Sequence, residues 1–198
     1  MMTACAGRRA IHFAPASVEE SARILASWRQ SVERADVGPA RLLYDAKVSQ
    51  GPFRMSGTLA VKAGARSVEA TLSGPFGDTL ASYRGGMFTG KNIKPLSIDE
   101  EELRWLLAGA WRGSGPPEVG GANGGQALLR WTVGEKVEAV LDVAGSRVRS
   151  LEVKRREGAI LATYTGEDPG RPRQIELEDL GSGNTMKLTL VAAEPLAD

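Results

Sequence analysis

The stretch Phe53-Arg54-Met55-Ser56-Gly57-Thr58-Leu59-Ala60-Val61-Lys62 decides the fold class of this chain, because its apolar residues recur at every second position. Side chains of a strand point alternately to its two faces, so this pattern predicts a strand with one apolar face and one wet or mixed face. A turn-like segment follows, and Val68, Ala70 and Leu72 continue the alternation. The sequence therefore predicts a β-hairpin over residues 53–72.

Short alternating segments of the same kind fill most of the remaining chain. Turn signals rich in Gly, Asp and Asn separate them, a spacing typical of an antiparallel meander. Two more strands are expected before residue 100, at 79–83 and 87–93. The expected later strands are 127–133, 136–143, 147–155, 159–165, 173–180 and 185–191. Because the period of two already begins at residue 41, the sequence predicts a mainly β chain of about eleven strands, with no internal repeat.

The segment before the first strand has the period of an amphipathic helix. Ser17 and Glu20 have the spacing of a capping box, in which each side chain satisfies a free backbone N–H. The apolar stripe expected to face the core consists of Val18, Ala22, Leu25, Trp28 and Val32. Asp36-Val37-Gly38-Pro39 is expected to end this helix.

A second helix is expected to open at Ser97, with Glu100 completing its capping box. Acidic residues crowd its first turn, where the helix dipole favours negative charge. Its apolar stripe consists of Leu103, Leu106, Leu107, Ala110 and Trp111. The glycine-rich segment 113–125 has no apolar pattern and is expected to be a mobile loop.

The composition sets limits on the class of protein. The chain has 198 residues, 42% of them hydrophobic and 25% charged, which is normal for a folded domain. Its formal net charge of +1 gives no basic field for nucleic acid. The one cysteine allows no internal disulfide, and no run of 18 apolar residues occurs. Residues 15–198 are therefore expected to form one domain after a flexible tether, 1–14.

Catalytic chemistry finds little support in the sequence. His12, the one histidine, lies in the expected tether, so the domain offers no imidazole for a nucleophile–base pair. No Cys and His cluster exists for a metal, and the acidic run 99–102 is explained by the helix start. The glycines of 120–125 lack the Lys that a phosphate loop needs. We expect no enzyme, no cofactor and no metal, although a glycosidase-like carboxylate pair is not ruled out by sequence.

The N-terminus has the pattern of a bacterial lipoprotein signal. Thr3-Ala4-Cys5 places small residues before a cysteine, as the lipoprotein peptidase requires. On this interpretation Cys5 carries lipid and the precursor begins upstream of Met1. The alternative is an ordinary N-terminus with one stray cysteine.

The chain resembles the bacterial lipoprotein carriers of the LolA and LolB family. The resemblance rests on the Thr3-Ala4-Cys5 start, the helix with Trp28, the glycine-containing strand at 55–61 followed by Gly74-Pro75-Phe76-Gly77, and the second helix with Trp105. It covers roughly residues 17–192. It implies a curved antiparallel half-barrel lidded by two or three helices, with an apolar concave side for acyl chains.

The resemblance also implies a function and its partners. The chain would be an outer-membrane lipoprotein, anchored at the periplasmic face through Cys5, that binds acyl chains of lipoproteins or other lipids. A periplasmic carrier protein would be its partner, and transfer would be non-covalent. One departure is that the turn 63–66, which corresponds to a loop with a bulky leucine in LolB, has no large apolar residue.

The residues expected to line the lipid cavity are apolar and alternate on the strands or lie along the second helix. They are Phe53, Met55, Leu59, Val61, Val68, Leu72, Met87, Leu103, Trp105, Leu106, Trp111 and Trp131. For each of them, ordinary core packing is the alternative, and a structural or scaffolding lipoprotein with a filled core is the alternative function. Phe76 is expected to close one end of the hollow.

Overall fold

The computed structural model describes residues 15–90, 93–121, 123–132, 136–155, 158–166 and 170–196, and only the backbone at 93–97 and 155. Cys5, His12 and the rest of the expected tether lie outside these residues. Within them, neither helix has the length and apolar character needed to cross a membrane.

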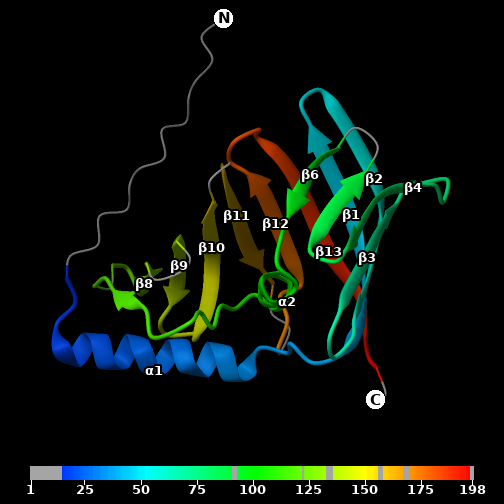
Figure 1. Cartoon of the computed structure of the whole chain (residues 1–198). Coiled ribbons are helices and arrows are strands. Elements are labelled where there is room, and N and C mark those ends of the chain that lie inside the picture. Colours follow the sequence, from blue (N-terminus) through cyan, green and yellow to red (C-terminus); the bar gives the residue numbers. More distant parts are fainter. Residues whose placement is uncertain are drawn as a thin grey trace, which may run out of the picture.

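The described strands form one antiparallel sheet of thirteen strands, curved into an open half-barrel (Figure 1). Along the sheet the order is β6-β5-β4-β3-β2-β1-β13-β12-β11-β10-β9-β8-β7. The first six strands are β1 (Ala40–Gln50), β2 (Phe53–Ala63), β3 (Val68–Ser73), β4 (Thr79–Arg84), β5 (Met87–Gly90) and β6 (Ile93–Ser97). The later strands are β7 (Glu118–Val119), β8 (Gln126–Trp131), β9 (Lys136–Asp142), β10 (Arg147–Arg155), β11 (Gly158–Thr165), β12 (Gln174–Asp179) and β13 (Asn184–Pro195).

One long-range pairing joins the two halves of the sheet. β1 pairs with β2 on one side and with β13 on the other, so that Ala46 lies opposite both Gly57 and Leu188. Every other neighbouring pair in the sheet is consecutive in sequence. The β1–β13 pairing therefore makes a single sheet from two meanders.

The mainly β half-barrel expected from the sequence is confirmed, and the strand count is corrected. The expected strand 87–93 is in fact a hairpin of β5 and β6, and the segment 113–125 contains β7. A two-residue edge strand has too few positions to show an alternation, which is why the sequence pattern missed it.

The long helix α1 (Val18–Arg34) runs along one end of the half-barrel (Figure 1). Ser17 caps it by accepting a hydrogen bond from the Glu20 N–H at 3.2 Å. Its expected apolar stripe is confirmed in part: Trp28 is buried and Leu25 and Val32 pack against the core, whereas Val18 is 91% exposed and Ala22 is exposed. The buried residues of the helix are Ile24, Ser27, Trp28 and Ser31.

A polar contact explains why a serine lies on the buried face of α1. Ser27 donates a hydrogen bond to the Val143 carbonyl at 2.9 Å and lies 3.1 Å from the Ser146 hydroxyl at the β9–β10 turn. Serines are small enough to let the helix approach the turn closely. A prediction from hydrophobic periodicity misses them, because it counts only apolar residues.

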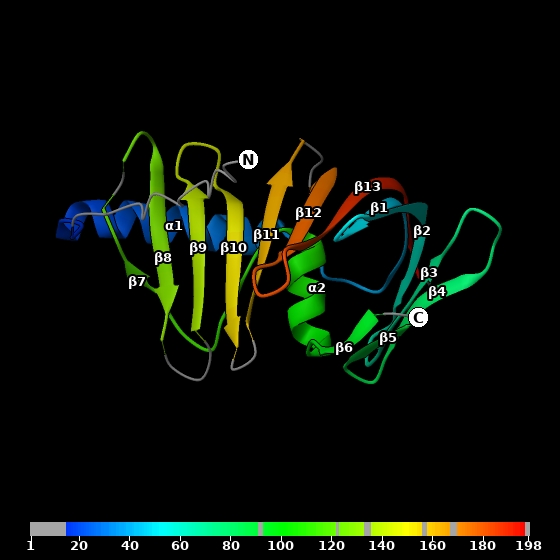
Figure 2. The same ribbon diagram turned by 90° about the horizontal axis from the view of Figure 1, so that it is seen from above.

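The short helix α2 (Glu100–Ala108) lies inside the curve of the sheet (Figure 2). Its N-cap is Asp99, which forms a capping box with Glu102, so the expected start at Ser97 is wrong. Ser97 instead ends β6. The expected stripe is buried, although Ala110 and Trp111 lie beyond the last helical residue.

Candidate functional site

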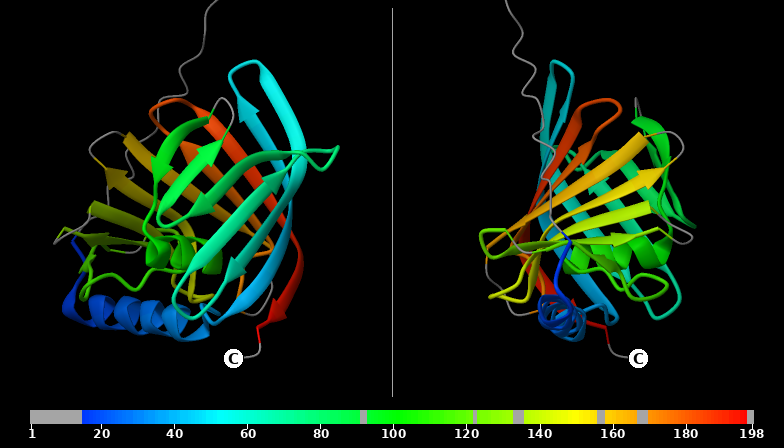
Figure 3. Two further views of the ribbon diagram at one scale, coloured as in Figure 1. Left: turned by 45° about the vertical axis from the view of Figure 1, so that its right-hand side comes forward. Right: turned by 90° about the vertical axis from the view of Figure 1, so that its left-hand side faces the viewer.

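The candidate site is the interior of the half-barrel between α2 and the concave face of the sheet, which we call the hollow. The two views of Figure 3 show α2 on the concave side of the sheet. Polar contacts fix the position of α2. Arg104 donates through Nη2 to the carbonyls of Gly64 and Ser67, in the turn between β2 and β3. Glu100 accepts a hydrogen bond from the Val68 N–H at 3.2 Å. One face of α2 is thereby tied to a single turn of the sheet.

The end of α2 is shaped by Gly109. This residue has a φ of 67°, in the left-handed region, and its N–H bonds back to the helix. A Cβ at this position would lie 3.0 Å from Pro172 Cδ, so a side chain would press on the connection between β11 and β12. The helix can therefore sit this close to the sheet only with glycine here.

Most of the predicted cavity residues are deep in the closed hollow. They point inward from β2 and β3 or toward the sheet from α2, and each is at most 8% exposed: Leu59, Val61, Val68, Leu72, Leu103, Trp105 and Leu106. In this state they pack against one another, so their contact with a lipid stays a prediction.

Trp111 and Trp131 lie at the end of the half-barrel next to α1, which we call the closed end. Trp28 of α1 donates its indole N–H to the Trp111 carbonyl at 2.9 Å. Its ring meets that of Trp131 edge-on, with centroids 5.9 Å apart. Trp131 in turn donates to the Gly115 carbonyl at 2.9 Å. These tryptophans fasten α1 and the segment after α2 to the sheet.

The opposite end, with the β1–β2 and β12–β13 turns, is the open end, and neither described helix covers it (Figure 1). Here a row of half-buried side chains crosses four neighbouring strands on the concave face. Cross-strand pairing sets them side by side. We call this set the apolar row: Met55 (β2), Val48 (β1), Met186 (β13) and Leu177 (β12). Phe53, one step further out on β2, is 72% exposed.

The sequence predicted only part of this open end. Phe53 and Met55 were found through their alternation, whereas Val48, Leu177 and Met186 were missed. Their place beside Met55 depends on the β1–β13 pairing, for which no local signal exists. On β5, Phe88 points inward, and its ring centroid lies 4.9 Å from that of the buried Tyr83. Met87, the preceding residue, points to the opposite face and is 41% exposed. Met87 is therefore outside the hollow.

Two cavities complete the geometry. A cavity of about 10 Å³, the size of one water molecule, lies beneath α2 beside Val68, Leu107, Arg104 and Arg171. A groove of about 390 Å³ lies mainly on the outer face of β1, β2, β3 and β13, and charged side chains such as Arg41, Lys62 and Glu69 line it. The inner cavity is too small for an acyl chain while α2 stays in place.

A polar cluster is buried at the base of the hollow. Tyr44 (β1), Tyr164 (β11) and Arg171 (between β11 and β12) are each at most 7% exposed. Burial raises the pKa of Tyr44 to about 12, although the nearby Arg171 charge opposes the shift. Burial, together with the nearby Tyr44, also raises the pKa of Tyr164. Both phenols therefore stay protonated at neutral pH, and each has a proton to donate to an acceptor.

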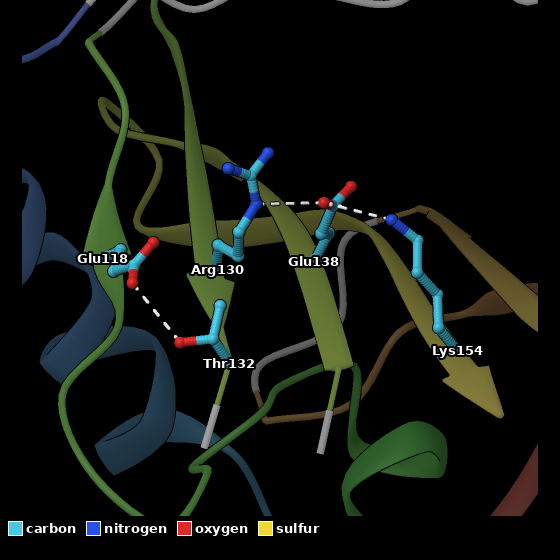
Figure 4. Close-up of polar contacts among 5 residues, drawn as sticks. All are labelled: Glu118, Arg130, Thr132, Glu138 and Lys154. Atoms are coloured by element: carbon cyan, nitrogen blue, oxygen red, sulfur yellow. Dashed lines mark hydrogen bonds and ion pairs between the residues drawn. The ribbon is translucent and has the colours of Figure 1, made fainter. Parts of the chain in front are cut away.

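The outer face of the C-terminal half is polar and internally paired (Figure 4). Glu138 accepts from Arg130 at 3.0 Å and from Lys154 at 3.1 Å, while Thr132 donates to Glu118 at 3.3 Å. Burial opposes ionisation of Glu138, but these two bases outweigh it and lower its pKa below the ordinary 4.5. Within the described ranges, no three His, Cys, Asp or Glu side chains are grouped to hold a metal ion. This outer face is therefore suited to water.

Comparison with known proteins identifies the fold. No protein-family model matches the chain, and no curated protein matches it in sequence. A LolA superfamily protein from Nitrosomonas europaea is similar in structure, with a TM-score of 0.55 and 12% identity over 90% of this chain and 94% of the other. A DUF1329 family protein from Desulfovibrio piger has a TM-score of 0.50 and 9% identity over 93% and 96%.

The chain has a LolA/LolB-like fold. In this LolA/LolB-like half-barrel the turn between β3 and β4 projects beyond the sheet (Figure 1). The Gly74 N–H bonds the Asp78 carbonyl at 2.8 Å and closes a tight turn. Phe76 at its tip is 95% exposed, so the expectation that it closes the hollow is wrong. A bulky apolar residue does protrude from a strand-connecting turn, but not from the turn 63–66.

Proposed function

We propose that this protein is a lipid carrier of the bacterial envelope that takes up acyl chains between α2 and the concave face of the sheet. One observation carries the proposal: the apolar concave face is covered by α2, a helix of nine residues tied mainly to the β2–β3 turn. The LolA/LolB-like fold supports it. The same fold supports a binding protein over an enzyme.

The energetics of α2 fit such a role. Isolated helices shorter than about 12–15 residues are marginal in water, so α2 owes its helicity to docking. Release of α2 would expose Leu59, Val61 and Leu72, and an acyl chain would replace the apolar contacts of the helix. Each buried CH₂ group contributes about 0.8 kcal/mol, so uptake and transfer need no nucleotide.

Delivery to a membrane is the second part of the proposal. An exposed Phe at a tight turn, such as Phe76, has the character of a residue that inserts between lipid headgroups. We further propose that Cys5 carries a lipid anchor at the periplasmic face of the outer membrane, and that a soluble carrier protein hands over the cargo. An inserted Phe76 and a lipid on Cys5 would give the protein two contacts with one membrane.

Uptake of a fluorescent fatty acid tests the lipid-carrier proposal. Arg104→Ala removes the main anchor of α2 and is expected to accelerate uptake several-fold, because α2 opens more often. Arg149→Ala is the matched control: this arginine pairs with Asp142 at 2.6 Å on the outside of the sheet, away from α2. Equal uptake rates for the two variants, or no uptake at all, would contradict the proposal.

A filled-core scaffolding protein is the second candidate function. It is favoured by the inner cavity of about 10 Å³, which leaves no room for cargo at rest. This alternative predicts that Arg104→Ala lowers the free energy of unfolding without any uptake of lipid. Measuring unfolding and uptake on the same preparations separates the two functions.

A further inference from the structure

Three hydrogen-bond donors at the base of the hollow lack an acceptor. The hydroxyls of Tyr44 and Tyr164 and the Nη2 of Arg171 are buried, and none forms a hydrogen bond within the described part of the chain. They come from three elements, β1, β11 and the β11–β12 connection. A buried donor without an acceptor destabilises the folded state, so three together indicate a binding site for a ligand that supplies acceptors.

The charge at this site is poorly balanced. Arg171 Nη2 lies 3.1 Å from Asp36 Oδ2 without hydrogen-bonding geometry, and only its Nε donates to that carboxylate. The Asp36 side chain is 58% exposed while that of Arg171 is 6% exposed, so water screens the acid more than the base. Arg104 and Arg171 both line the cavity of about 10 Å³ beneath α2. Among the described residues, no carboxylate lines this cavity.

We propose that Tyr44, Tyr164 and Arg171 form the binding site for the anionic headgroup of a lipid, a carboxylate or a phosphate, whose acyl chain lies in the hollow. This inference rests on the proposed lipid-carrier function. It narrows the cargo to lipids with one anionic headgroup. The three donors match the acceptor-only oxygens of such a headgroup. A water molecule would satisfy the donors but would add no negative charge beside Arg171.

The fold provides a path for the tail. From Tyr44 the inward positions of β1 continue through Ala46 and Val48, so the path passes the apolar row and reaches the open end at Gln50. Six residues of strand span about 20 Å, comparable to an extended long acyl chain. Tyr164 packs under the C-terminal end of α2 next to Gly109. The headgroup would therefore lie beneath the helix, and α2 must move aside to admit it.

Titration with three matched ligands, dodecanoate, dodecyl phosphate and dodecanol, tests the headgroup site. We expect both anions to bind about tenfold or more tightly than the alcohol, as hydrogen bonds to charged groups allow. Tyr44→Phe and Tyr164→Phe should each weaken the anions about fivefold and leave dodecanol unchanged. Neither variant should lower the thermal midpoint of the ligand-free protein, because each removes a donor that has no acceptor.

Tyr83→Phe is the matched control, because the buried Tyr83 hydroxyl donates to the Ile98 carbonyl at 2.7 Å. It should lower the thermal midpoint and keep the preference for anions. Equal affinity for the three ligands would overturn the headgroup site and leave the carrier function intact, whereas no binding of any ligand would contradict the carrier function itself.

Inorganic phosphate alone separates a lipid headgroup from a free anion. It should not shift the thermal midpoint, because without a tail nothing replaces the contacts of α2. A shift that disappears in Tyr44→Phe would assign the cluster to a free anion and overturn the lipid assignment. If Tyr44→Phe destabilises the ligand-free protein as much as Tyr83→Phe does, a bound water molecule satisfies these donors and the proposal is also overturned.

Discussion

The closed and open ends of the half-barrel are built from the same strands and differ in what covers them. At the closed end, α1 and the segment after α2 bury Trp28, Trp111 and Trp131, and the indoles of Trp28 and Trp131 donate hydrogen bonds to backbone carbonyls. At the open end, Val48, Met55 and Met186 have the same inward orientation and stay half-buried. Alternation along a strand thus fixes which face a residue takes, and the helices fix whether that face is core or binding surface.

The largest expected effect is on the closed end. Trp131→Ala should lower the free energy of unfolding by about 3–5 kcal/mol, because it leaves a cavity and removes the contact with Trp28. Phe53→Ala, at the open end, should change it by less than about 0.5 kcal/mol, since that side chain is already exposed. Urea denaturation of both variants measures the difference. Similar losses would mean that the two ends do not differ as described.

A second variant concerns the helix between the two ends. Gly109→Ala should cost about 1–3 kcal/mol, because alanine both strains the left-handed backbone and presses on Pro172. Gly51, in the open-end turn, has a φ of 55°, and a methyl group at this position would meet nothing within 4 Å. Gly51→Ala should therefore cost only the backbone strain, about 1 kcal/mol. Equal costs in thermal or urea unfolding would show that α2 does not press on the sheet at Gly109.

A substitution in the apolar row should have a smaller effect on stability and a clear effect on lipid binding. Met186→Gln should weaken binding of a fluorescent fatty acid several-fold while changing the unfolding free energy by less than about 1 kcal/mol. Met87→Gln is the control, because this methionine is exposed on the other face of the sheet. Loss of binding in both variants would indicate a nonspecific surface effect.

The smallest effect concerns the outer face. Because paired bases lower the pKa of folded Glu138 below 4.5, its ion pairs stabilise the protein above that pH, and the stabilisation is lost as the pH falls through the lowered value. Glu138→Gln should therefore cost up to about 1 kcal/mol at neutral pH. The difference from the wild type should shrink as the pH falls below 4.5 and the carboxylate becomes protonated. A difference that persists there would point to packing as its cause.

The sequence predicted the fold class and the buried face of α2, because both depend on local periodicity. Leu103, Leu106 and Leu107 follow the helical period, and residues 53–61 follow the strand period. The face of α1 was predicted only in part, because the polar Ser27 and Ser31 are also buried on it. Ser27 bonds the distant β9–β10 turn, and Ser31 bonds the Trp28 carbonyl within the helix. The apolar row and the cluster of Tyr44, Tyr164 and Arg171 were missed because they form only after β1 pairs with β13.

The β1–β13 pairing also determines when the sheet can be completed during synthesis. β13 comes after the other described strands along the chain, yet it occupies the middle of the sheet. Until it is synthesised, the edges of β1 and β12 are unpaired, and each can hydrogen-bond to the edge strand of another molecule. Contacts of such large sequence separation slow folding. A nascent chain of this protein therefore exposes two unpaired strand edges, β1 and β12, until β13 is available.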